Sequence, residues 1–410
     1  MTRARSIALV LLLAGAPVAL AQADETAPHP QAQLAQAELV AQSEPALVMR
    51  ELLVLQTDRY DNIANNPKLI QTTLFSPIPH KSRAKRVDAN GDYAFVPMPL
   101  GLITFQGQID EPMKLRLTLD DPRDRFHGHW PADTIQNNRF LEWQDLGTTA
   151  ARRQTIPFPE RNDWLSTLRA SDNRTWFQSR DGLSKERFIL YDPSIHFTSA
   201  ISLSSTNAYY QASNAHPDQA PPPLCVLIRK TESGWSSDTI AAPWPSKTVV
   251  IASKKSGADS ATTLVQALAP VAERLTSRGY NEQEIELALA MTGSTGFDNS
   301  SMSLVYILPD GVIDEHIRLQ VKPMPDQIIR TAIVVVKNVN PDLSSVINAL
   351  LDDLGSDQWA KRDQAQRELI TLGKAAIKKV QQLESNKDPE IAFRARLILE
   401  AYDLKIEQGK

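Results

Sequence analysis

The chain has 410 residues, of which 42% are hydrophobic and 22% are charged. This composition is typical of a globular protein and excludes a disordered chain, and the length allows two or three domains. The formal net charge of −4 argues against nucleic acid as the main partner, because nucleic-acid-binding domains carry clustered positive charge. Proline is frequent at 27 residues and glycine scarce at 16, a balance that favours strands and proline-bounded loops over glycine-rich phosphate-binding loops.

The first 23 residues have the order of a cleaved secretory signal. Two arginines precede a short apolar run, and Ala21-Gln22-Ala23 then supplies the small residues of a cleavage site. We therefore expect a signal peptide over residues 1–23, a mature chain that begins at Asp24, and export to the periplasm or the extracellular space of a bacterium. No later apolar run approaches the ~20 residues that cross a bilayer, so we expect no membrane span after cleavage.

Residues 46–258 are expected to form a β-rich, sandwich-like domain, preceded by a flexible lead-in over residues 24–45. Short runs of β-forming residues alternate with proline, asparagine, aspartate and glycine clusters, and helical periodicity is almost absent. The expected strands are Ala46–Leu55, Tyr93–Val96, Gly101–Gln106, Met113–Leu119, Arg187–Tyr191, Cys225–Lys230 and Thr248–Ile251, with a short helix at Trp164–Ser171. The nearly unbroken apolar run at Ala46–Leu55 fits a helix or a buried strand, and we favour the strand. Cys225 is the single cysteine, so no intrachain disulfide can form, and its apolar neighbours predict a buried thiol.

From Ala261 the spacing of the apolar residues becomes helical. Asn281, with Glu284 three residues later, has the pattern of a capping box at the start of a second helix. Three apolar runs then predict strands at Leu304–Leu308, Ile317–Val321 and Ile328–Val336. We therefore expect an α+β block over residues 259–340, and a multidomain α+β protein as a whole.

Four amphipathic stripes predict four helices over residues 341–410. Gly373 is placed to end one helix, Asp388 to cap the next, and Pro389 to occupy its first position. Trp359 lies in the first turn of its helix, where a large aromatic can close the gap to neighbouring helices. If it is fully buried there, its truncation to alanine should melt the tail. Since an isolated set of helices this small has little stability, we expect the helices to dock on the preceding block through residues 343–354.

These helices resemble a known repeat family. The residues that carry the resemblance are Leu354-Gly355-Ser356, Trp359, Arg362, Ala365, Leu369, Leu372-Gly373, Ala376, Val380, Leu383, Asp388-Pro389-Glu390 and Arg394-Ala395, and they are similar to HEAT-like repeats of the phycocyanobilin-lyase type. The resemblance is confined to the tail and covers about 60 residues. It implies stacked helical hairpins, with the Asp-Pro-Glu and Arg-Ala segments opening the next hairpin, and a scaffold that docks proteins. It carries almost no information on activity.

Two arginines of this tail have two interpretations. Arg362 and Arg394 lie inside or beside the apolar stripes. Either their stems pack on the hairpin while their heads pair with a carboxylate or a helix end, which we favour, or they face a ligand. Residues 342–410 hold 11 basic and 12 acidic side chains, a balance that offers no basic face for DNA.

The segment His127-Gly128-His129 is the nearest approach to a metal site, because alternate residues of a strand point to one face. Asp124 and Asp133 are the only nearby residues that could complete it. We favour a polar loop or strand edge instead. Since no nucleotide-binding, zinc-protease, hydrolase or paired-cysteine motif occurs, we expect no catalytic residue, no cofactor and no metal.

Six of the seven tryptophans lie in the β-rich region, at Trp130, Trp143, Trp164, Trp176, Trp235 and Trp244. Buried tryptophans would fill the core of that region, whereas exposed ones would stack on sugar rings. We predict an exported, non-catalytic scaffold whose HEAT-like tail docks another envelope or extracellular protein. The alternative is a carbohydrate-binding or glycan-processing protein that uses the β-rich domain. The candidate partner or ligand surface comprises Trp359, Arg362, Arg394, Trp130 and Trp143.

Overall fold

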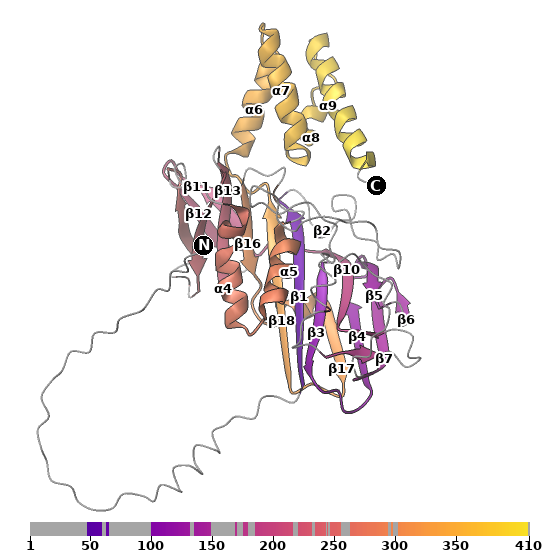
Figure 1. The fold of residues 1–410 in the computed structure, drawn as a ribbon. Helices are drawn as coiled ribbons and strands as arrows, with labels where there is room; N and C mark the ends of the chain where they lie inside the picture. Colours follow the sequence, from indigo (N-terminus) through magenta and orange to yellow (C-terminus); the bar gives the residue numbers. More distant parts are fainter. Residues whose placement is uncertain are drawn as a thin grey trace, which may run out of the picture. The chain divides into compact units, whose positions relative to one another are not determined.

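The structure is a computed structural model of the chain, and it describes residues 47–59, 63–64, 100–131, 135–148, 169, 175–178, 185–215, 220–231, 234–242, 244, 247–255, 263–293, 297 and 302–408. The fold is mixed α and β, with a large region of several sheets followed by C-terminal helices (Figure 1). We call residues 47–337 the sheet body and residues 343–408 the helical module. None of the described helices combines the length and apolarity that a membrane crossing requires. The expected signal peptide, the lead-in, the strand at Tyr93–Val96 and nearly all of the helix at Trp164–Ser171 lie outside the described residues.

A nine-stranded mixed sheet forms the centre of the sheet body. Its strands follow the order β14-β13-β16-β18-β1-β3-β10-β2, with β5 paired to β10. They are β1 (Leu47–Asp58), β2 (Ile63–Ala64), β3 (Gly101–Gly107), β5 (Arg125–Trp130), β10 (Phe188–His196), β13 (Leu224–Thr231), β14 (Gly234–Ala241), β16 (Met302–Ile307) and β18 (Gln327–Lys337). β1 runs parallel to β18 and antiparallel to β3. Because β1 is buried on both faces, its sequence is a nearly continuous apolar run without alternation.

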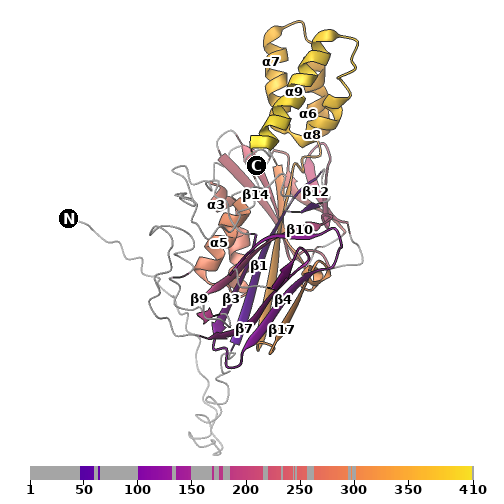
Figure 2. The ribbon, with the colours of Figure 1, turned by 90° about the vertical axis from the view of Figure 1, so that its right-hand side faces the viewer.

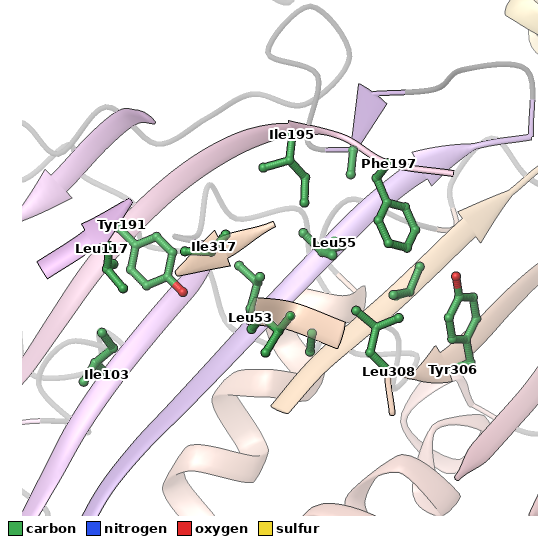
Figure 3. Close-up of a cluster of buried hydrophobic side chains, with 14 of the residues drawn as sticks. Leu53, Leu55, Ile103, Leu117, Tyr191, Ile195, Phe197, Tyr306, Leu308 and Ile317 are labelled. Carbon is green, nitrogen blue, oxygen red and sulfur yellow. The ribbon is translucent and has the colours of Figure 1, made fainter. Parts of the chain in front are cut away.

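Two smaller sheets complete the sheet body. One has the order β17-β4-β7-β8-β9, with β6 paired to β7, and the other has the order β11-β12-β15. Their strands are β4 (Met113–Leu119), β6 (Ile135–Asn137), β7 (Phe140–Thr148), β8 (Phe177–Gln178), β9 (Lys185–Glu186), β11 (Ile201–Ser205), β12 (Tyr209–Asn214), β15 (Thr248–Ser253) and β17 (Ile317–Lys322). Both contribute to a core shared with the central sheet, in which Leu53 and Leu55 of β1 gather with Leu117 of β4 and Ile317 of β17 (Figure 3).

Helices cover the other face of the central sheet (Figure 2). They are α3 (Leu264–Ala267), α4 (Ala269–Ser277) and α5 (Glu282–Gly293), and a short 3-10 turn at Val312–Glu315 precedes β17. Successive side chains of a strand point to opposite faces, so β1 supplies Leu53 and Leu55 to the core between the sheets and Leu52 and Val54 to the core under the helices. One strand therefore anchors both cores.

The start of α5 confirms the expected capping box. Asn281 Oδ1 accepts a hydrogen bond from the backbone N–H of Glu284, and Glu284 Oε2 accepts one from the backbone N–H of Asn281, both at 3.0 Å. The second carboxylate oxygen of the buried Glu284 accepts a hydrogen bond from Thr104 Oγ1 at 2.5 Å. The cap thus also ties α5 to β3.

Every expected strand that falls on described residues is present, although several bounds move by a few residues. Cys225 of β13 is fully buried, as expected, and burial raises the pKa of its thiol far above the ordinary value. β5, β7, β11, β12 and β14 had no sequence signal, because polar residues, glycine or tryptophan interrupt their apolar pattern.

The central sheet crosses the expected boundary between residues 258 and 259. β16 and β18, from the segment expected to form a separate α+β block, lie between β13 and β1 of the β-rich segment. The two segments therefore share one sheet. A sequence pattern locates strands but does not name their partners, and the parallel pairing of β1 with β18 joins residues far apart in the chain.

The helical module consists of α6 (Leu343–Asp353), α7 (Trp359–Leu372), α8 (Lys374–Gln381) and α9 (Pro389–Gln408). Gly373 ends α7 with a positive φ of 55°, and Asp388 Oδ1 accepts a hydrogen bond from the N–H of Glu390 at 2.8 Å, so the expected helix ends are confirmed. Buried residues from all four helices form the module's own core: Leu343, Ile347, Leu350, Leu354, Ala365, Leu369, Ala375, Ala376, Val380, Ala395 and Ile398.

α6 directs its buried face into this core, not onto the sheet body, so the expectation that residues 343–354 dock on the preceding block is wrong. A polar contact with the sheet body lies just before α6. There Asp342 accepts hydrogen bonds from Ser205 Oγ at 2.9 Å and from Lys254 Nζ at 2.8 Å.

Candidate protein-interaction surface

Large exposed hydrophobic side chains concentrate in the helical module. Of the residues that the structure describes, those with such side chains are Tyr209, Val250, Met324, Val346, Trp359 and Phe393. Three of the six belong to the module, which is much smaller than the sheet body, and both exposed aromatics outside β12 are among them. Contiguous exposed apolar surface often marks an interaction site, whereas single exposed residues need no explanation.

Trp359 is the first residue of α7 and is 65% exposed, so the condition of full burial, under which its truncation would melt the module, is not met. The residues of α7 that enter the module's core are Ala365 and Leu369. At 3.6 residues per turn, these two positions lie about 100° around the helix from Trp359. The indole therefore projects from the flank of α7, not into its packed face.

Phe393 of α9 is 52% exposed. Ala395 and Ile398 of the same helix enter the core, and helical geometry places them at about 140–200° from Phe393. The phenyl ring therefore points away from the core.

The two exposed aromatics lie at the same end of the module. Arg362 of α7 approaches Glu390 of α9 at 3.6 Å, and one turn further along both helices Gln366 pairs with Arg394. Because the two contacts advance together, α7 and α9 run parallel and begin at the same end. Trp359 and Phe393 occupy the first two turns of these neighbouring helices.

Arg362 and Arg394 both make contacts within this end of the module. Arg362 donates to the carbonyl oxygens of Ser356 at 2.7 Å and Asp357 at 3.2 Å, the loop that leads into α7. Arg394 is buried and donates to Glu390 at 2.7 Å and to Gln366 at 2.7 Å. The guanidinium groups of both arginines are thus paired within the module, which is the interpretation that we favoured over ligand binding.

The tryptophans of the sheet body offer no exposed platform among the described residues. Trp143 is 1% exposed and donates its indole N–H to the carbonyl of Pro131 at 3.2 Å. Trp130 is half-buried and donates to the buried carboxylate of Glu186 at 3.0 Å. Trp235 is buried, Trp176 and Trp244 are half-buried, and Trp164 lies outside the described residues.

His127 and His129 turn to different partners. His127 Nε2 lies 2.8 Å from Ser194 Oγ of β10, and the ring of His129 packs edge-on against Trp143. Asp133 lies outside the described residues. The expected set is therefore not assembled around the two histidines, and Asp124 instead contacts His196, a residue that sequence reasoning missed because nothing in the local pattern relates two positions that far apart.

The chain matches no known protein family and no curated protein. Function must therefore be argued from the surface itself.

Proposed function

We propose that this chain is an exported, non-catalytic interaction protein, in which a sandwich-like sheet body carries a HEAT-like helical module that docks another envelope or extracellular protein. The observation that supports the proposal is the exposure of Trp359, with the exposed Phe393 at the same end of the module. Tryptophan is enriched among the few residues that supply most of the binding energy at protein interfaces.

The charge of the module favours a protein partner over a polyanion. Its 10 basic and 11 acidic residues nearly cancel, and Arg362 and Arg394 are already committed to internal contacts. The partner that fits such a surface is a protein with an apolar pocket for an indole ring and a mixed polar rim.

A carbohydrate-binding role has less support. Sugar recognition by a sheet needs exposed aromatic faces, and the described tryptophans of the sheet body are buried or half-buried. We keep this role as the outcome that replaces docking if the following experiment fails.

The experiment uses the mature full chain as bait against an envelope extract, with Trp359→Ala as the test variant. Tyr209→Ala is the matched control, because Tyr209 is an exposed aromatic of the sheet body. We expect a saturable partner whose affinity falls at least about 30-fold with Trp359→Ala, the loss of a typical hot spot, and stays unchanged with Tyr209→Ala. A chain truncated after Asn340 should capture nothing while its sheet body stays folded.

Capture that survives both the truncation and Trp359→Ala would contradict the docking proposal. Saturable quenching of tryptophan fluorescence by soluble glycans would instead favour the carbohydrate role. Export is tested separately: the native protein should begin at Asp24, and mass spectrometry that finds residues 1–23 retained would contradict the proposed signal peptide.

A further inference from the structure

Four strand ends meet at one place in the sheet body. The end of β4 at Leu119 pairs with the start of β17 at Ile317. The start of β5 at Arg125 pairs with Ser194, near the end of β10. The loop of residues 120–124 joins β4 to β5. This pairing brings the carboxylates of that loop to the histidines that end β10 and precede β17.

The loop is fixed against both neighbours by hydrogen bonds. The N–H of Asp120 donates to the carbonyl oxygen of His316 at 3.3 Å, and the N–H of His196 donates to Asp124 Oδ1 at 2.7 Å. Backbone N–H groups therefore help to fix the position of the loop, which does not depend on its exposed side chains alone.

Asp121, Asp124 and His196 each offer one ligand atom, and these three atoms lie within 4.8 Å of one another. Asp124 Oδ1 is 2.9 Å from His196 Nδ1. A tetrahedral ion with bonds of ~2.0–2.2 Å holds its ligand atoms about 3.3–3.6 Å apart, so small side-chain rotations bring all three atoms into the range of one ion.

The environment of the Asp124 carboxylate points to a ligand. Its side chain is 1% exposed, its Oδ1 accepts a hydrogen bond from the backbone N–H of His196, and its Oδ2 has no hydrogen-bond partner among the described residues. A buried carboxylate oxygen without a partner is costly. A cation held between Asp124, Asp121 and His196 would remove that cost.

The neighbouring residues orient the ligands. Arg123 donates to both carboxylate oxygens of Asp121, at 3.0 and 2.7 Å, and holds the pKa of that carboxyl far below its usual range. The backbone N–H of Arg123 also donates to Asp121 Oδ1, at 2.8 Å. Three of the about four acceptor positions of the ionised carboxylate are therefore filled, and one, on Oδ2, is left for an ion. His316, whose ring packs on Phe197 at 5.4 Å between centroids, lies close enough to Asp124 to interact with its charge.

We propose that Asp121, Asp124 and His196 form a binding site for a divalent transition-metal ion, with Zn²⁺ as the best fit. Two carboxylates and an imidazole suit zinc, whereas Ca²⁺ and Mg²⁺ prefer oxygen ligands alone. Three protein ligands leave one position for water. The proposal replaces the expectation that the chain binds no metal, and it is independent of the docking proposal because the site lies in the sheet body.

The test titrates ZnCl₂ into the mature full chain without a histidine tag, after removal of metal with a chelator. We expect one zinc per chain by calorimetry and elemental analysis, and no displacement by excess Ca²⁺ or Mg²⁺. Asp124→Asn and His196→Ala should weaken binding at least about 100-fold, since loss of residues that only support ligands already costs 10- to 100-fold. His127→Ala is the matched control, because this exposed neighbouring histidine contacts Ser194 instead, and it should bind zinc as the wild type does.

Circular dichroism and thermal melts report whether each variant folds. If Asp124→Asn does not fold, Asp121→Asn decides, because Asp121 is partly exposed and tolerates substitution. Zinc should raise the melting midpoint of the wild type and of His127→Ala but not of Asp121→Asn. Failure of the wild type to bind zinc, binding that survives all three ligand substitutions, or binding lost with His127→Ala would each overturn the proposal.

Discussion

The sheet body and the helical module differ in the burial of their large aromatic side chains. The sheet body buries them: Trp143, Tyr191, Tyr306, Phe105, Phe177 and Phe188 are fully enclosed. Among the described side chains of the module, the core holds leucine, isoleucine, valine and alanine, and the aromatics Trp359 and Phe393 are exposed. A region this small has little interior in which to bury an indole.

The sheet body also encloses an ion pair. Glu51 of β1 is fully buried and accepts hydrogen bonds from Arg330 of β18, its neighbour in register, and from the hydroxyl of Tyr191. Tyr280 donates to the backbone carbonyl of Glu51 at 2.7 Å. Burial and the charge of Glu51 raise the pKa of Tyr191. The sheet body thus encloses large aromatics and a fully buried carboxylate, whereas the described core of the module is aliphatic and its buried Arg394 pairs with Glu390, which is 46% exposed.

Among substitutions compared at one pH, the largest effect is expected from breaking the buried ion pair. Arg330→Met should lower the free energy of unfolding of the sheet body by about 3–5 kcal/mol, because Glu51 would stay buried without its partner. Arg318→Met is the control: Arg318 is 58% exposed beside Asp120, and its loss should cost no more than about 1 kcal/mol. Urea unfolding followed by tryptophan fluorescence measures the free energy of unfolding of both variants. Equal losses would mean that the buried Glu51–Arg330 pair stabilises the sheet body no more than an exposed pair does.

A similar loss confined to the other region is expected from Leu369→Ala. Leu369 is fully buried in the module's core, and removing its side chain should cost about 2–5 kcal/mol. Hydrogen exchange should accelerate across α6, α7, α8 and α9 while the amides of β1 keep their protection. Equal acceleration in β1 would mean that the two regions unfold as one unit.

A smaller effect tests how closely the aromatics of the sheet body are packed. A Cβ at Gly101 would lie 2.3 Å from the ring of Tyr191, whereas one at Gly147 would meet nothing within 4 Å. Gly101→Ala should therefore destabilise by about 1–3 kcal/mol, and Gly147→Ala should change stability by less than about 1 kcal/mol. Thermal melts of the two variants give the comparison, and a neutral Gly101→Ala would contradict the packing around Tyr191.

The next prediction concerns pH. Burial raises the pKa of Asp192 to about 8, although its Oδ1 accepts a hydrogen bond from the N–H of Leu100. Between pH ~4 and ~8 the folded protein then holds one proton more than the unfolded chain, so stability falls as pH rises, by at most about 1.4 kcal/mol per pH unit, and levels off above pH 8. Asp192→Asn should remove this slope. Urea midpoints from pH 5 to 9 that run parallel in the two proteins would contradict the prediction.

The smallest effect on stability is expected from Trp359→Ala. Since Trp359 is largely exposed, its loss should change the free energy of unfolding by no more than about 0.5 kcal/mol. A loss of several kcal/mol in thermal unfolding would show that the indole is packed, and would remove the module's contrast with the sheet body.

What the sequence predicted follows from local patterns. Met113–Leu119 alternates apolar and polar residues, and it forms β4 with those bounds. The cap at Asn281 and the end at Gly373 likewise need only a few neighbouring residues. The exposure of Trp359 could not be predicted, because an aromatic beside an apolar stripe does not reveal how thick the module is.

The contacts between distant segments could not be predicted. Asp124 and His196 meet only because β5 pairs with β10, and Glu51 meets Arg330 only because β1 lies beside β18. Neither pairing leaves a signal in the single sequence, since a strand pattern does not specify its partner. The candidate metal site therefore became visible only in the fold.

Site-specific photo-cross-linking in the producing cell tests directly whether the end of the module with Trp359 contacts a partner protein. A photoreactive phenylalanine at position 359 should give one discrete cross-linked species, and the same group at position 209, also an exposed aromatic site, should give none. A discrete species from position 359 that disappears when unlabelled mature chain is supplied in excess is the result that the account predicts. No species from position 359, or the same species from both positions, would contradict it.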